Sequence, residues 1–455
     1  MAIKILIKND YRLMSNFTIF ELNSNKMKYL QISSKLFVQN REKLFSKLSR
    51  NGIAILNSND IMPTNADGTM PFRQNNDLFW LSGIDQEESV LIIFPDHPNQ
   101  NMREILFLKE TNEHIAIWEG EKLDKNKAHI ISGIKTVFWL DELDNKLNEL
   151  ISEADSIYLN ENIHSRAASD VQTRDDRFKI KICKNFPNKK ILTVAPIMHE
   201  LRAIKSKFEI ELLQNACDLT GKGLRRILPL IKPGIMEYEI EAELMHEFLS
   251  NRSNGFAYQP IIGSGFDSCV LHYIDNNKEC KDGDILLMDF GAEYANYASD
   301  LTRTVPVNGK YNSRQKEVYA SVLHVMKEAT KMLTPGTKFK EYNKEIGRMM
   351  ELELINLKLL DKHDVMKQNL KKPLYKKYFM HGTSHYLGLD VHDVGSMEWI
   401  MKEGMVFTCE PGIYIQEESL GIRLENDILV TEEGPQDLMK NIPIEIKEIE
   451  YLMRS

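Results

Sequence analysis

The chain has 455 residues, which is more than one hydrophobic core usually organises, so two or three domains are expected. Hydrophobic residues make up 42% and charged residues 27%, a balance typical of folded globular proteins and unlike that of disordered ones. The net charge of −8 argues against a nucleic-acid binder, and no apolar run in the sequence is long enough for a membrane span.

The beginning of the chain carries no recognisable targeting pattern. Residues 1–26 lack a long apolar core and a small-residue cleavage site, so they do not resemble a signal peptide. We expect an accessory extension, or a translated leader ahead of a start at Met27. The alternative is a short strand at residues 3–7 that pairs with the edge of a sheet.

Short apolar runs alternate with helical patterns from Met27 to residue 195, which predicts an α/β domain. Apolar residues at helical spacing predict a helix over residues 28–48. We expect strands at the apolar runs GIAILNS, VLIIFPD, EILFLKE and SIYLN. The alternation of short strands and helices continues through KAHIISGI and VFWLDEL. We place the domain boundary near Pro196, where the character of the sequence changes.

Long helices and strands in hairpin order make up residues 196–455. One amphipathic helical region is expected from Met198 to Leu230, before the break at Pro233–Gly234, and a second helix from Glu237 to Leu249. The expected strands are DILLMDFG, YASDLTRTVPV, GMVFTCEPGIYI and LGIRLENDILVT. Strands paired in hairpins, with helices grouped apart, predict an α+β domain with an antiparallel sheet.

Four carboxylates interrupt apolar strands of this second domain: Asp289, Asp300, Glu410 and Glu425. Taken alone, an Asp at a strand end usually forms a turn or cap, and a Glu before proline can simply end a strand. Buried together, however, four negative charges require a cation. With His385 they suit divalent ions such as Mn²⁺, Co²⁺ or Zn²⁺, and bridging carboxylates suit a pair of them.

The five cysteines are scattered and odd in number, and no two form a CxxC pair. This pattern argues against a disulfide framework and a structural zinc site, and it favours a reducing, cytoplasmic location. Cys409 lies next to Glu410 and alternates to the opposite strand face, so we interpret it as core and not as a nucleophile. The basic run at residues 371–377 is expected to be a solvated segment.

The order and spacing of several motifs resemble the metal-dependent Xaa-Pro peptidases of the pita-bread fold, the family of aminopeptidase P and its relative prolidase. The motifs are GSGFDSCVLHY (263–273), MDFGAEYANYASDLTRTVPV (288–307), HGTSHYLGLDVHDVG (381–395), EPGIYI (410–415) and GIRLENDILV (421–430). RQNNDLFWLSG (73–83) resembles a signature of the family's N-terminal domain. The resemblance implies a pita-bread catalytic domain over residues 196–455. A creatinase- or ribonuclease-H-like α/β domain would precede it over residues 27–195.

The resemblance also implies a ligand set for two divalent metal ions. We expect both ions to be Mn²⁺. Asp289 matches the bidentate ligand of one metal, Asp300 and Glu425 match the bridging carboxylates, and His385 and Glu410 match the remaining ligands. GTSH stands where many members have GLSH or GLGH, a departure that touches no ligand.

Other positions match residues that act on the substrate or support the metals. Glu410 would move a proton, His392 would stabilise the oxyanion, His381 would line the proline side, and His272 would contact the substrate near the scissile bond. Arg423 and Tyr414 would support the metal ligands. The simpler alternatives are a strand histidine at position 272, a cap at position 392 and an ordinary ion pair between Arg423 and Glu425.

The function implied is that of a metalloaminopeptidase that removes the first residue from peptides with proline second; a prolidase acting on Xaa-Pro dipeptides is the alternative. The C-terminal segment runs on from EPGIYI with few insertions, which favours the aminopeptidase. The family also implies a homo-oligomer, a dimer or tetramer. Its N-terminal domain would shape the cleft, with Arg73 and Trp80 as candidates, although Trp80 could equally be core.

Overall fold

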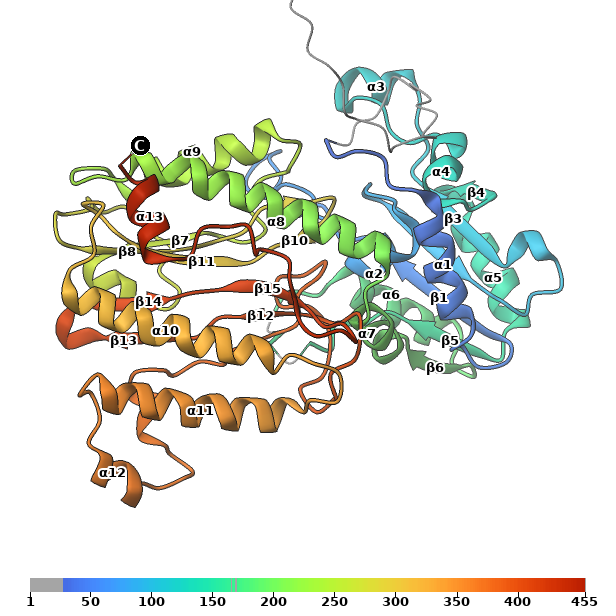
Figure 1. Cartoon of the computed structure of the whole chain (residues 1–455). Helices are drawn as coiled ribbons and strands as arrows, with labels where there is room; N and C mark the ends of the chain where they lie inside the picture. The colour runs from blue at the N-terminus through green and yellow to red at the C-terminus, as the bar shows by residue number, and fades with distance from the viewer. Residues whose placement is uncertain (1–27, 165, 168–169, 455) are drawn as a thin grey trace, which may run out of the picture.

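The structure is a computed structural model that describes residues 28–164, 166–167 and 170–454 in two domains (Figure 1). The extension predicted at residues 1–26 lies outside the described residues. Within the described part of the chain, no helix has both the length and the apolar character needed to cross a membrane. The predicted domain boundary falls at the start of α7 (Ala195–Ala203), and it stays a prediction.

A mixed six-stranded sheet forms the centre of the N-terminal domain, in the order β4-β3-β2-β1-β5-β6. Its strands are β1 (Gly52–Asn57), β2 (Ser89–Ile93), β3 (Glu104–Leu108), β4 (Thr136–Trp139), β5 (Ser156–Leu159) and β6 (Lys190–Thr193). Strands β1, β2 and β3 pair antiparallel, whereas β4, β5 and β6 join in parallel. The predicted α/β domain is therefore present. The order of the strands in its sheet was not predicted from the sequence.

Helices cover both faces of this sheet. Side chains of α5 (Leu143–Glu153) and α6 (Arg174–Asn185) pack on one face with Ile53, Ile55 and neighbouring strand residues. On the other face lie α1 (Ser34–Phe45), α2 (Asn76–Ser82) and α4 (Lys125–Ser132), whose core is continuous with that of the second domain. A short helix, α3 (Glu113–Glu119), projects from the edge (Figure 1).

The helix predicted over residues 28–48 is shorter than expected. It begins after Ser33, whose backbone is extended, and Leu30 lies outside it with 63% of its surface exposed. Serine favours helix caps over helix interiors, so the pair Ser33–Ser34 marks the start that apolar spacing alone did not.

Antiparallel strand pairs form the second domain. They are β7 (Ile261–Ser264), β8 (Ile285–Phe290), β9 (Glu293–Tyr294), β10 (Tyr297–Ala298), β11 (Leu301–Pro306), β12 (Val406–Cys409), β13 (Gly412–Ile415), β14 (Leu420–Arg423), β15 (Asn426–Leu429) and β16 (Gln436–Asp437). Strand β8 lies between β7 and β11, β12 pairs with β15, and β13 pairs with β14. The predicted antiparallel α+β domain is confirmed, and Cys409 is fully buried in its core.

Two pairs of long helices enclose these strands. In Figure 1, α8 (Lys207–Ile227) and α9 (Glu237–Ser250) lie above the strands, and α10 (Ser313–Lys331) and α11 (Phe339–Asn356) lie below them. Two shorter helices follow, α12 (Lys362–Lys367) beyond α11 and α13 (Ile446–Leu452) at the C-terminus. The strands that carry the candidate site residues are thus held between two helical layers.

The single helical region predicted from Met198 to Leu230 is wrong in one respect, because it is two helices. Ile204, after α7, has an extended backbone, and a new helix starts at Ser206. There the Glu209 carboxylate accepts the Ser206 N–H at 2.8 Å and the Ser206 hydroxyl accepts the Glu209 N–H at 3.4 Å. This capping box ends one helix and begins the next.

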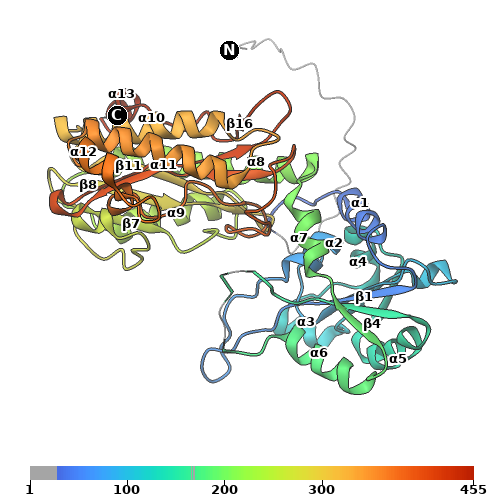
Figure 2. The same ribbon diagram turned by 90° about the horizontal axis from the view of Figure 1, so that it is seen from below.

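Buried polar contacts join the two domains, which lie side by side and are linked through α7 (Figure 2). The Trp80 indole N–H donates to Glu209 at 2.7 Å. Arg202 lies 2.8 Å from Asp77 of the N-terminal domain and 2.6 Å from Asp393 of the second domain. All three members of this ion-pair set are at least nine-tenths buried, so its geometry fixes how the domains meet.

Candidate active site

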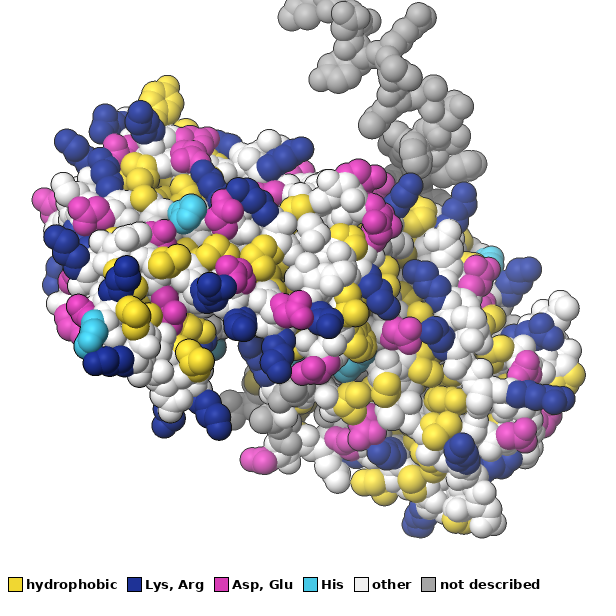
Figure 3. All heavy atoms as spheres, turned by 60° about the horizontal axis from the view of Figure 1, so that its bottom comes forward, with side chains coloured by type: hydrophobic (Ala, Val, Ile, Leu, Met, Phe, Trp, Pro, Cys, Tyr) yellow, Lys and Arg dark blue, Asp and Glu magenta, His cyan; other side chains and the backbone are white. Residues whose placement is uncertain are grey.

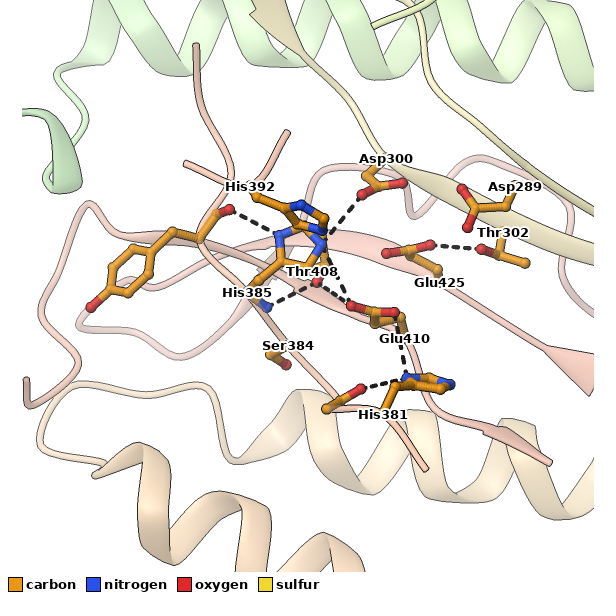
Figure 4. Close-up of polar contacts among 12 residues, drawn as sticks. Asp289, Asp300, Thr302, His381, Ser384, His385, His392, Thr408, Glu410 and Glu425 are labelled. Atoms are coloured by element: carbon orange, nitrogen blue, oxygen red, sulfur yellow. Dashed lines mark hydrogen bonds and ion pairs between the residues drawn. The ribbon is translucent and has the colours of Figure 1, made fainter. Parts of the chain in front are cut away.

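The four carboxylates singled out in the sequence come together on neighbouring strands (Figure 4). Asp289 lies on β8 and Asp300 directly precedes β11, and the antiparallel register places Thr302 opposite Asp289. Glu410 follows β12, and Glu425 lies between β14 and β15. These residues are far apart in the chain, and the pairing of the strands brings them together.

His385 completes the cluster. Its Nε2 atom lies 3.4 Å from Asp300 Oδ2 and 3.5 Å from Glu410 Oε1. One ligand atom each from Asp300, His385 and Glu425 can be chosen so that all three lie within 4.8 Å of one another. The His385 Nδ1 atom is 2.9 Å from the carbonyl oxygen of Tyr386, a contact that orients the ring.

Arg423 forms an ion pair with Asp289. Its Nη2 donates to Asp289 Oδ2 at 2.5 Å, and its Nη1 donates to the Tyr414 hydroxyl at 2.8 Å. The expected supporting positions of Arg423 and Tyr414 are therefore beside the cluster. Arg423 does not simply pair with Glu425, because its bonded carboxylate is that of Asp289.

Three hydroxyl groups that the sequence analysis missed also contact the carboxylates. The Tyr258 hydroxyl lies 2.5 Å from one oxygen of Asp289 and 2.5 Å from one oxygen of Asp300. Thr302 donates to Glu425 at 2.6 Å, and Thr408 donates to Glu410 at 3.4 Å. The two threonines lie on β11 and β12, but Tyr258 comes from a loop with no sequence pattern that could have indicated it.

The electrostatics of the cluster match a site built for cations. Burial raises the pKa of Glu410 to about 7, and repulsion from Asp300 adds to this effect while His385 opposes it. Burial also raises the pKa of Asp300 and Glu425 well above their usual range, with further repulsion among the carboxylates. One guanidinium group, Arg423, does not balance four carboxyl groups, whereas divalent cations would. The donor set, oxygen-rich with one imidazole, fits such ions.

Two of the three predicted substrate histidines lie beside this cluster. His381 Nδ1 is 3.7 Å from Glu410 Oε2, and the rings of His385 and His392 pack edge-on with centroids 4.4 Å apart. Burial lowers the pKa of both His381 and His392 to about 3, and His272 adds a smaller effect in the same direction. Both rings are therefore neutral near pH 7. His272 itself is exposed, and it lies after the short 3₁₀ helix Gly265–Cys269.

A cavity of about 530 Å³ opens beside His392 between the two domains. Arg73 lines it and donates to the carbonyl oxygen of Leu389 at 2.7 Å, so this predicted cleft residue is in place. Trp80 does not line the cavity; it is 1% exposed and belongs to the core, the second of its two expected roles. Asp175 lines the cavity from the side of the N-terminal domain.

The arrangement of an antiparallel domain, a cation-binding cluster and a cleft closed by a second domain is that of a metal-dependent hydrolase with an accessory N-terminal domain. Comparison with known families agrees. Metallopeptidase family M24 matches residues 211–432, and the aminopeptidase P N-terminal domain matches residues 37–158.

Individual relatives match across both domains. The Xaa-Pro aminopeptidase of Escherichia coli is 33% identical, over 93% of this chain and 98% of its own length, and that of Haemophilus influenzae is 34% identical, over 92% and 96%. Zinc-substituted aminopeptidase P of E. coli in complex with product superimposes with a TM-score of 0.84 at 32% identity, covering 93% of this chain and 99% of the other. The chain therefore belongs to metallopeptidase family M24, in its aminopeptidase P group, and the expected pita-bread fold is confirmed.

Proposed function

We propose that this chain is a dinuclear-metal aminopeptidase that hydrolyses the bond before proline and releases the first residue of Xaa-Pro peptides. The observation that carries the proposal is the convergence of His385 and four carboxylates, two of them buried and two half-buried, beside a cleft between the domains. The Xaa-Pro aminopeptidases that match the whole chain support the choice of substrate.

Five side chains would hold the ions. Asp289 would bind one, Asp300 and Glu425 would bridge the two, and His385 and Glu410 would complete the second. When bound, the divalent cations supply Lewis acidity, which activates water for attack and polarises the scissile carbonyl group. We propose Mn²⁺ as the native ion, because carboxylate oxygens dominate the donor set; Co²⁺ and Zn²⁺ are compatible with it.

Glu410 is placed to move the proton. Its two carboxylate oxygens face His385 at 3.5 Å and His381 at 3.7 Å, so the group lies between the cation-binding cluster and the neighbouring histidine. We propose that Glu410 takes a proton from the attacking water and delivers it to the proline nitrogen. That nitrogen must be protonated to leave, because the anion formed by breaking the C–N bond is too basic to be expelled, and the amide nitrogen of proline has no hydrogen of its own.

The neutral histidines would bind the substrate on either side of the scissile bond. A ring N–H of His392 can donate to the carbonyl oxygen as negative charge develops there. His381 Nε2 lies 2.8 Å from the Tyr414 hydroxyl, and its ring packs against Phe379 with centroids 4.9 Å apart. The aromatic rings around His381 suit the apolar ring of proline. His272, at the exposed rim, would contact the substrate near the scissile bond.

The cellular setting and the assembly are also proposals. All five cysteines are free thiols, which supports a reducing cytoplasm. Ile117 and Trp118 on α3 are each 78% exposed, and apolar side chains of this size gather at interfaces between subunits. We therefore propose that α3 contributes to the contacts of a dimer or tetramer.

The decisive experiment compares Ala-Pro-Ala with the dipeptide Ala-Pro after chelation and the addition of Mn²⁺. We expect free alanine and Pro-Ala from the tripeptide, with a higher kcat/KM than for the dipeptide. Ala-Ala-Ala tests the need for proline, and the Glu410→Gln variant tests for contaminating peptidases. Cleavage of the dipeptide alone would identify a prolidase, and cleavage of neither with bound metal would refute the proposal.

A further inference from the structure

Two adjacent lysines near the proposed proline pocket differ in their partners. Both lie in the 3₁₀ helix Leu374–Lys377, within the basic run that the sequence analysis expected to be solvated. Lys377 Nζ is 2.9 Å from Glu417 and 2.9 Å from the Tyr378 hydroxyl. Among the described residues, Lys376 Nζ has one acceptor at hydrogen-bond distance, the carbonyl oxygen of His381 at 3.3 Å. Within the described part of the chain, Lys376 forms no ion pair.

The ammonium group of Lys376 lies beside two aromatic rings. Its Nζ atom lies 5.2 Å from the centre of the Tyr375 ring and 5.6 Å from that of Phe379. Partial burial lowers the pKa of Lys376. An accessible, partly desolvated cation without an anion is a site that a carboxylate would satisfy.

This cation adjoins the site on the side assigned to proline. Phe379 stacks edge-on against His381, and the His381 ring reaches both the Tyr414 hydroxyl at 2.8 Å and Glu410 at 3.7 Å. A chain of contacts therefore runs from Glu410 through His381 to Lys376, whose ammonium group donates to the His381 carbonyl oxygen. Figure 3 brings the underside of the molecule forward and shows Lys and Arg side chains beside hydrophobic ones on the catalytic domain.

We propose that Lys376 binds the C-terminal carboxylate of the residue that follows proline, so that short Xaa-Pro-Xaa peptides are the favoured substrates. This inference rests on the proposed function. In an extended peptide the third residue lies two steps of about 3.5 Å, or ~7 Å, beyond the scissile carbonyl. The four-carbon stem of an exposed lysine is flexible, so its ammonium group can adjust to the position of the carboxylate. On binding, the ammonium group exchanges a bond to a neutral carbonyl for a stronger one to a carboxylate.

The test compares Ala-Pro-Ala with its C-terminal amide in the Mn²⁺-loaded wild type, Lys376→Met and Lys377→Met. Methionine keeps an unbranched apolar stem over the aromatic rings while the charge is removed. The ratio of kcat/KM for the acid to that for the amide should fall about tenfold in Lys376→Met, mainly through KM. It should stay at the wild-type value in Lys377→Met, whose lysine is already paired, and be largely restored by Lys376→Arg.

Each outcome separates this inference from the proposed function. A wild-type enzyme that cleaves acid and amide equally well, or a Lys376→Met variant with an unchanged ratio, overturns the inference and leaves the aminopeptidase intact. A larger loss on Ala-Pro than on Ala-Pro-Ala would show that the lysine binds the carboxylate of proline itself, which also overturns it. If the loaded wild type cleaves no Xaa-Pro peptide, the proposed function fails first.

Discussion

Asp175 should make the stability of the protein depend on pH. It is the second residue of α6, it lines the cavity between the domains, and its carboxylate accepts a hydrogen bond from Asn57 at 2.9 Å. Burial raises the pKa of Asp175 to about 6, and Asp77 adds repulsion, while the Asn57 bond and Arg174 oppose the rise. The folded protein therefore binds this proton more tightly than the unfolded chain does.

The sign and size follow from that difference. A carboxyl group with a raised pKa in the fold stabilises it at low pH, and this stability is lost as the pH rises through about 6. The rise from the ordinary 3.8 to about 6 corresponds to at most about 3 kcal/mol when the group is fully ionised. Solvent screening lowers this figure, because the side chain is partly exposed.

The Asp175→Asn variant keeps an acceptor for Asn57 and cannot ionise. Its gain in unfolding free energy over wild type should be larger at pH 8 than at pH 4.5, by up to about 2 kcal/mol. Thermal unfolding would record this as a Tm difference of about 2 °C, because 455 residues unfold with an entropy of about 1 kcal/mol/K. Asp141→Asn, at an exposed position, is the matched control. Equal gains at both pH values would refute the reasoning, as would a variant less stable than wild type at pH 8.

Four further predictions follow from the site and the domain contacts. Chelation should abolish activity and lower Tm, and Mn²⁺ should restore both; full activity in metal-free protein would contradict the site. Glu410→Gln should lower kcat at least about 100-fold, and near-normal turnover with metal content verified would remove its catalytic role. Arg202→Met removes the buried charge partner of Asp77, whereas Asp393 keeps Lys205 at 3.0 Å, so the unfolding free energy measured in urea should fall by about 3 kcal/mol, the low end for a broken buried pair; a loss below about 1 kcal/mol would mean that water replaces the guanidinium. Trp118→Glu should shift the mass measured by light scattering towards the monomer, and an unchanged mass would exclude α3 from the interface.

The candidate site could be predicted because its residues break a local pattern. Asp289 and Glu425 stand in apolar strands, where an ionised side chain is expensive unless something compensates it. The antiparallel hairpins then bring strand positions together that are far apart in the chain. The helix start at Ser206 also has a sequence signal, because Ser206 and Glu209 have the spacing of a capping box, although the apolar period continues across it.

Contacts made by irregular segments could not be predicted in this way. Tyr258 reaches two carboxylates from a loop, and Arg202 joins residues 125 and 191 positions away along the chain. Hydrophobic periodicity does not predict contacts between residues this far apart in the sequence, because the packing of the domains determines which residues meet.

Lys376 and Lys377 show that even adjacent residues can differ in contacts that the sequence does not predict. The two are neighbours of the same type in one basic run, and the sequence gives no reason to distinguish them. Only the fold pairs Lys377 with Glu417 and turns Lys376 towards His381. A charged side chain can bind a substrate where the fold leaves it accessible and without a counter-charge. Composition can therefore locate a basic segment. Only the tertiary contacts can identify the lysine in it that remains available to a substrate.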